Sequence, residues 1–94
     1  MESKQDISKR WAREGFSFDT WVDPPRQVWE DFVHETDEMV YVLEGEVELE
    51  VKKKVRTLGP GDEALIPAHA NHSVRNVGGT TAYWLYGYRM KNSD

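Results

Sequence analysis

Two histidines and one glutamate are the residues of this chain best placed to do chemistry. His34 and Glu38 flank the polar turn Glu35-Thr36-Asp37, so a hairpin can direct both side chains to one interior surface. His72 comes from a separate segment, where it opens a strand after Pro67. Two imidazoles and one carboxylate form a facial triad, which leaves coordination positions open and suits Fe(II), Mn, Ni or Zn. We therefore expect a divalent metal site formed by His34, Glu38 and His72.

The segments around these residues resemble the two sequence motifs of the cupin superfamily. The matching positions are, in chain order, His34, Glu38 and Gly45 in the first motif, and Gly61, Pro67, His72 and Asn76 in the second. The resemblance covers residues 26–76. It implies an all-β fold, the double-stranded β-helix, which is a small jelly-roll barrel with the metal inside. We expect a single barrel domain over residues 16–94, preceded by an N-terminal segment over residues 1–15.

Three positions depart from these motifs. Arg26 stands in place of the opening glycine, Phe32 in place of the first histidine, and His69 in place of the glycine between Pro67 and His72. Phe32 matters most, because it leaves the metal site one imidazole short, so that water or substrate would fill the vacancy. The alternative is a barrel that has lost its metal and keeps the remaining histidines and Glu38 as a satisfied buried network.

Several other polar residues could belong to the site. His69 could be a fourth ligand, but its small neighbours favour a surface loop. Glu30 could face the interior as an acid or a substitute ligand, but we favour an exposed charge beyond a β-bulge. Arg75 has strand parity opposite to that of His72, and we expect Asn76 to satisfy backbone groups at a turn. The remaining acidic residues of this region, Asp31, Glu35 and Asp37, are expected to be solvated charges.

Short strands must position these residues. Hydrophobic alternation and turn signals predict strands over residues 16–22, 27–34, 38–43, 47–51, 55–58, 64–66, 72–77 and 81–89. Gly45 is expected at a bend or bulge. The Lys52-Lys53-Lys54 turn has no Gly or Asn, so one lysine is expected in a strained conformation.

The aromatic and aliphatic residues predict a covered outer surface. The strand over residues 38–43 is apolar on both faces, although a barrel interior needs only one. Trp29 and Val33 are expected to continue that outer surface, and Trp84, Tyr86 and Tyr88 share a face of the last strand. Either the N-terminal segment covers the surface, as a helix capped by Ser3 and Asp6 or as an edge strand, or a second copy does. We expect a homodimer.

Composition narrows the possible functions. The 94 residues contain no cysteine and carry a net charge of −5. Nucleic acid is therefore not expected as a partner, and neither is a membrane, since no long apolar run is present. Absence of cysteine and of a visible signal peptide favours the cytoplasm. We expect a metal-dependent enzyme of the oxygenase or isomerase type acting on a small molecule, with a non-catalytic binding or sensing module as the alternative.

Overall fold

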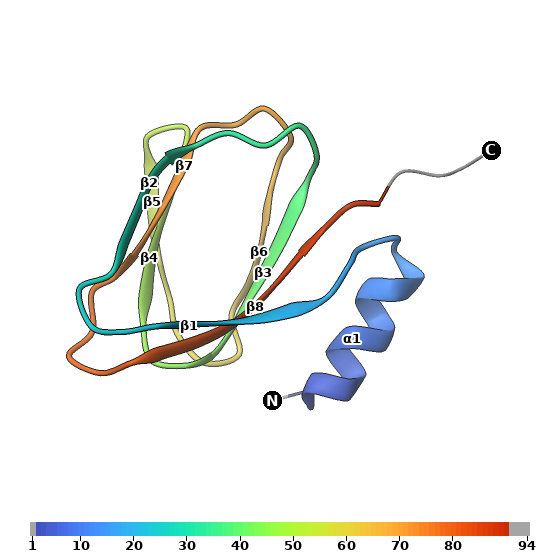
Figure 1. Cartoon of the computed structure of the whole chain (residues 1–94), viewed down its shortest axis with the longest axis horizontal. Coiled ribbons are helices and arrows are strands. Elements are labelled where there is room, and N and C mark those ends of the chain that lie inside the picture. The colour runs from blue at the N-terminus through green and yellow to red at the C-terminus, as the bar shows by residue number, and fades with distance from the viewer. Residues whose placement is uncertain (1, 91–94) are drawn as a thin grey trace.

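The computed structural model describes residues 2–90 and contains one helix and eight strands (Figure 1). Residue 1 of the expected N-terminal segment and residues 91–94 of the expected barrel domain lie outside the described residues. The helix is α1 (Lys4–Arg13), and the strands are β1 (Asp19–Asp23), β2 (Val28–Phe32), β3 (Glu38–Glu44), β4 (Val47–Val51), β5 (Lys54–Leu58), β6 (Glu63–Ile66), β7 (His72–Asn76) and β8 (Ala82–Tyr88). Over residues 2–90, no helix is long and apolar enough to cross a membrane.

The strands form two antiparallel sheets that face each other. One has the order β1-β8-β3-β6 and the other β2-β7-β4-β5, and Figure 1 shows them as the two walls of a small barrel. Inward-facing side chains of both sheets, including Val40, Val42, Val47 and Leu49, form one buried core. The alternation read from the sequence produces this core, because every second residue of a strand points to the same face. The predicted small β-barrel is confirmed.

Helix α1 covers the outer face of the first sheet. Ser3 caps it by accepting a hydrogen bond from the backbone N–H of Asp6 at 3.1 Å, as Ncap serines commonly do. Ile7 and Trp11, one turn apart, are fully buried against Met39 and Tyr41 of β3. The helical alternative for the N-terminal segment is therefore confirmed, and the edge strand is wrong.

The same packing explains why β3 is apolar on both faces. Val40 and Val42 face the barrel interior, whereas Met39 and Tyr41 face α1. That outer face gave the reason to expect a homodimer, and the chain itself covers it. The oligomeric state stays a prediction that this face no longer supports.

Two local predictions are confirmed by the backbone. Gly45 has φ +84°, next to a register shift between Val42 and Glu44. Lys52 and Lys53, in the turn between β4 and β5, have φ values of 50° and 70°. Residues with a Cβ adopt this left-handed backbone conformation only at a cost in free energy. Two lysines, rather than one, therefore hold the left-handed conformation.

The direction of Trp29 was predicted wrongly. The β2–β7 register shifts between Trp29 and Phe32, and Asp31 has φ +59°. This bulge reverses the alternation, since an extra residue turns the following side chains to the other face. Trp29 therefore lines the barrel interior together with Phe32, while Val33 is exposed.

Candidate metal centre

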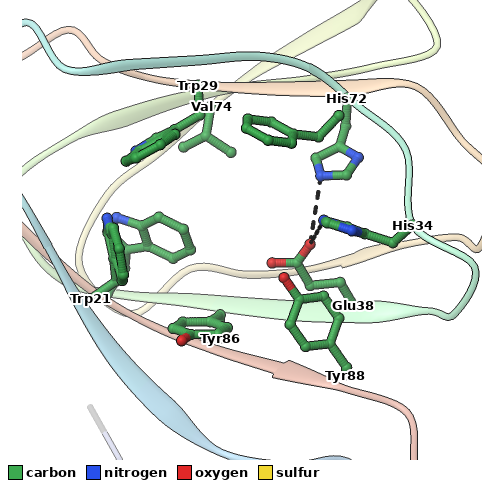
Figure 2. Close-up of a pocket in the computed structure, with 10 residues that line it drawn as sticks. Trp21, Trp29, His34, Glu38, His72, Val74, Tyr86 and Tyr88 are labelled. Carbon is green, nitrogen blue, oxygen red and sulfur yellow. Dashed lines mark ion pairs between the residues drawn. The ribbon is translucent and has the colours of Figure 1, made fainter.

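His34, Glu38 and His72 meet inside the barrel, as the sequence predicts. Glu38 is the first residue of β3 and His72 the first residue of β7, so the two come from opposite sheets. His34 lies in the connection between β2 and β3. One donor atom from each residue lies within 4.8 Å of the others, and Figure 2 shows the three side chains pointing toward one another.

Glu38 lies at the distance from each imidazole that a shared ion requires. Glu38 Oε1 lies 3.4 Å from His34 Nε2 and 3.5 Å from His72 Nε2. Ligands about 2.1 Å from one ion are separated by roughly 3.0–3.4 Å at octahedral to tetrahedral angles. The pair separations therefore match a shared ion at the tetrahedral end of this range.

Glu38 Oε1 is buried, and within residues 2–90 no donor forms a hydrogen bond with it. Such a group costs free energy unless a cation or a proton compensates it. Nδ1 of His72 lies 3.2 Å from the carbonyl oxygen of Ala70. With the proton on Nδ1, Nε2 presents a lone pair to Glu38, the arrangement found where an outer carbonyl orients a metal-bound histidine. The residues present fit a divalent ion. The metal-bound site and the metal-free buried network both stay predictions, because a protonated His72 Nε2 could also donate to Glu38.

The loop that carries His34 is tied down on both sides. The backbone carbonyl oxygen of His34 accepts a hydrogen bond from the backbone N–H of His69 at 2.8 Å. Asp37 accepts hydrogen bonds from the backbone N–H of Ala68 at 2.8 Å and from Arg89 Nε at 3.1 Å. The Ala68 hydrogen bond, with help from Arg89, holds the pKa of Asp37 below its usual range. Asp37 was expected to be a merely solvated charge, and the structure corrects this, because its carboxylate joins three segments around the site.

Phe32 occupies the place of a missing ligand. It is the register partner of His72 across β2 and β7. Its ring centroid lies 6.2 Å from that of His34 and 6.3 Å from that of His72. Position 32 therefore faces the site, as the motif comparison predicts, but presents an apolar ring.

The other candidate residues lie outside the site. His69 is exposed and is not part of the cluster. Glu30 forms an ion pair at 3.0 Å with Arg75, which also pairs with Glu48 and Glu50 on the outer face of the second sheet. Asn76 donates from its side chain to three backbone carbonyls and accepts from Gly78 N–H. The favoured interpretation of each residue is confirmed.

Arg26 and His69, which replace motif glycines, keep a backbone that suits glycine. Their φ values are +72° and +66°, in the left-handed region where a Cβ costs about 1–2 kcal/mol. His69→Gly is therefore expected to raise the free energy of unfolding by about 0.5–1 kcal/mol, after the loss from a more flexible unfolded chain. Urea unfolding measures this. The neighbouring change Ala68→Gly, which has no such strain to relieve, should instead destabilise the protein, and equal effects of the two would contradict the argument.

Two neighbours of Glu38, His72 and Tyr88, have raised pKa values. The pKa of His72 is raised, because a protonated Nε2 can hydrogen-bond to Glu38, although burial opposes this. Burial, reinforced by the charge of Glu38, raises the pKa of Tyr88 to about 12. Tyr88 lies opposite Glu38 in the sheet and lines the same cavity. The site therefore carries a phenol that stays protonated at neutral pH.

Sequence reasoning missed most of the cavity beside the triad. The cavity has a volume of about 220 Å³, and its walls include Trp21, Trp29, Trp84, Tyr86 and Tyr88. The shared face of Trp84, Tyr86 and Tyr88 was noticed, but it was considered only as part of an outer surface. It lines the interior instead. The alternation of β8 carried the signal, because Trp84 has the parity of an inward-facing residue once Leu85 is assigned to the helix-covered face.

Comparisons with known proteins agree with this architecture. Residues 20–88 match the cupin domain family, Cupin_2. The solved structure of TT1209 from Thermus thermophilus is 34% identical, with 79% of this chain and 72% of that chain covered and a TM-score of 0.72. No curated protein sequence matches the chain.

Two further solved structures share the fold at lower identity. Oxalate oxidase in complex with the substrate analogue glycolate is 23% identical, with 86% of this chain and 45% of that chain covered and a TM-score of 0.74. The Cupin_2 domain of an XRE family transcriptional regulator from Enterobacter cloacae is 22% identical, with 86% and 87% covered and a TM-score of 0.75. The family match spans His34, Glu38 and His72. This chain therefore belongs to the cupin family.

Proposed function

We propose that the protein binds one divalent metal ion through His34, Glu38 and His72 and uses it on a small molecule in the adjacent cavity. The observation that carries the proposal is Glu38 Oε1, which is buried, receives no hydrogen bond from the described residues and lies within 3.5 Å of two imidazole nitrogens. An isolated buried carboxylate oxygen is costly, and a cation at this point compensates it. Fe, Mn, Ni and Zn all accept such a donor set.

The cavity supports an enzyme of the oxygenase or isomerase type. Three protein ligands leave coordination positions free, and a bound ion there would polarise a substrate oxygen. The chain itself would hold the substrate between the sheets, exclude water with its aromatic walls and present the protonated hydroxyl of Tyr88 beside Glu38. The structural likeness to oxalate oxidase, an enzyme, is in line with this choice.

A non-catalytic binding or sensing module is the second candidate. Glu30 and Arg75, which were weak candidates for an acid and a substrate anchor, pair with each other on the outer face of the second sheet. Tyr86 and Tyr88 are then the remaining candidate proton donors among the described residues that line the cavity beside the triad. The likeness to the cupin domain of a transcriptional regulator supports this reading.

Metal titration tests the site directly. Protein freed of metal with a chelator is titrated with Zn²⁺ by calorimetry, and we expect one ion per chain. Glu38→Gln should weaken binding by at least roughly tenfold, because it removes the only carboxylate ligand. Phe32→His should strengthen binding, since it adds an imidazole beside His72.

The third histidine provides the control. His69→Asn removes an exposed imidazole and keeps a residue type that tolerates positive φ. Its Zn²⁺ affinity should equal that of the wild type. Wild-type protein that takes up no metal, or an affinity that depends on His69 and not on Glu38, would refute the proposed site.

Two expectations accompany the proposal. A cytoplasmic location, favoured by the absence of cysteine, and a homodimeric state stay predictions. Light scattering over a range of protein concentrations would measure the dimer directly.

A further inference from the structure

One buried carboxylate organises three tryptophans at the end of the cavity away from the metal centre. Asp23, the last residue of β1, is 1% exposed. Its Oδ1 accepts from the indole N–H groups of Trp21 at 2.7 Å and Trp29 at 3.0 Å, and its Oδ2 accepts from Trp84 at 2.9 Å. An indole N–H lies in the plane of its ring, so each hydrogen bond limits the orientation of a ring. Asp23 therefore fixes three rings, contributed by both sheets, in one arrangement, which we call the tryptophan cluster.

Aromatic side chains connect the tryptophan cluster to the metal centre along both walls. On the second sheet, the ring of Phe32 lies 6.1 Å from that of Trp29 and 6.3 Å from that of His72. On the first sheet, the row runs from Trp84 through Tyr86 and Tyr88 to His34, with successive ring separations of 6.0, 5.9 and 5.1 Å. Figure 2 shows Trp21 and Trp29 at one end of the cavity and His34, Glu38 and His72 at the other.

The lining restricts the chemistry of a ligand. Within residues 2–90, no lysine or arginine lines the cavity, so a carboxylate ligand would depend on the metal centre and its histidines for a positive partner. A cationic ligand would be repelled by that metal at close range. Ring faces and edges, in contrast, are offered from both walls and pair favourably with another aromatic ring.

Size and access agree with a single ring. A cavity of about 150 Å³ lined by apolar side chains is known to hold benzene, and this one has about 220 Å³. The extra space admits one or two small substituents. Trp21 and Phe32, which lie on the edge strands β1 and β2, are each 38% exposed, so they mark an apolar entrance between the two sheets.

We propose that the cavity binds an uncharged, single-ring aromatic compound that carries a hydroxyl group, with the ring beside the tryptophan cluster and the hydroxyl toward the metal centre. This inference rests on the proposed function for the position of the hydroxyl and for the exclusion of charged ligands. The ring site itself is formed by the chain alone.

Binding of catechol tests the proposal. Metal-free and Zn²⁺-loaded protein are each titrated with catechol, and binding is followed by tryptophan fluorescence and calorimetry. We expect saturable binding of one molecule per chain in both forms, tighter in the loaded form. Cyclohexanol, which has a similar size but no aromatic ring, should bind roughly tenfold more weakly, and glycolate should not bind the metal-free form.

A matched pair of variants locates the ring. Trp21→Leu removes one indole at the entrance and keeps an apolar side chain, so catechol affinity should fall by roughly tenfold. Its Zn²⁺ affinity should not change, because Trp21 does not contact the triad. Tyr83→Leu changes an exposed aromatic on β8 that does not line the cavity, and it should alter neither affinity.

The outcomes separate this inference from the proposed function. Zn²⁺ binding without catechol binding, cyclohexanol or glycolate binding as tightly as catechol, or unchanged catechol affinity in Trp21→Leu would each overturn the aromatic site. Catechol binding that Trp21→Leu weakens, in a protein that takes up no Zn²⁺, would support the aromatic site and refute the metal centre.

Discussion

Trp11→Ala is expected to lower the free energy of unfolding by about 3–5 kcal/mol, because it empties a fully buried site between α1 and the first sheet. The ring of Trp11 packs edge-on against Phe18 at 5.8 Å and lies in the cluster of Met39, Tyr41 and Leu85. Domains of this size are stabilised by only about 5–15 kcal/mol. The change therefore removes a large share of the total, and urea unfolding followed by circular dichroism measures it.

Arg13→Ala is the control for this variant. Arg13 lies on the same helix with an exposed side chain, so its replacement should change the free energy of unfolding by less than about 0.5 kcal/mol. The loss of Trp11 should also loosen α1 and uncover Met39 and Tyr41. Light scattering should then show a mass that rises with concentration, since exposed apolar surface promotes association.

The same experiment tests the expected homodimer. If Trp11→Ala lowers the free energy of unfolding by less than about 1 kcal/mol, the packing of α1 contributes little to the stability of the fold. The outer face of β3 would then be free for a second copy, which was the original reason to expect a dimer. If Trp11→Ala lowers the free energy of unfolding by several kcal/mol, the outer face of β3 is covered by α1 and not by a second copy.

The parts of the site that follow local rules could be predicted from the sequence. His34 and Glu38 flank one turn, so residue type and spacing were enough to pair them, and the resemblance to the second cupin motif added His72. Phe32 was placed at the site by the resemblance to the cupin motif, and the structure makes it the register partner of His72. The sequence also correctly predicted that β3 is buried on both faces. It left open whether the N-terminal helix or a second chain covers the outer face.

The parts that depend on backbone irregularity could not. Trp29 was assigned to the wrong face although a bulge near Glu30 was expected, because no glycine marks the positive φ at Asp31 that locates the bulge between Trp29 and Phe32. Asp23 directly follows the strand predicted over residues 16–22, and the sequence suggests no further role for it. Its role depends on Trp29 and Trp84, which reach it from two other strands, and no spacing along the chain predicts that meeting.

The sharpest test of the metal centre is the stability of Glu38→Gln without metal. In the wild type, Glu38 raises the pKa of His72. A raised pKa in the folded state means that this pair stabilises the fold below the unfolded pKa of histidine, about 6.5, and that the contribution is lost as the pH rises through the folded value. Above it, the carboxylate of Glu38 is buried beside an uncharged His72.

The effect of Glu38→Gln should therefore change sign with pH. In the presence of a chelator, the variant should be less stable than the wild type near about pH 5.5, where it loses the pair with protonated His72. Near about pH 8.5 it should be more stable by roughly 1–3 kcal/mol, because it replaces a buried carboxylate that no hydrogen bond satisfies with an uncharged amide. Glu46→Gln, at an exposed position between β3 and β4, should have little effect at either pH.

Zinc should reverse the order of the two proteins at the higher pH. A ligand that binds only the folded state at 100 times its dissociation constant stabilises that state by about 2.7 kcal/mol. The wild type should gain this stabilisation, because the ion joins Glu38 of the first sheet to His72 of the second, whereas Glu38→Gln should gain little. Thermal unfolding with and without Zn²⁺ measures both effects. The opposite result would be that Glu38→Gln is less stable than the wild type at both pH values and that Zn²⁺ does not stabilise the wild type. Glu38 would then be a structural residue of the barrel, because only a carboxylate already satisfied without metal stabilises the fold under all these conditions.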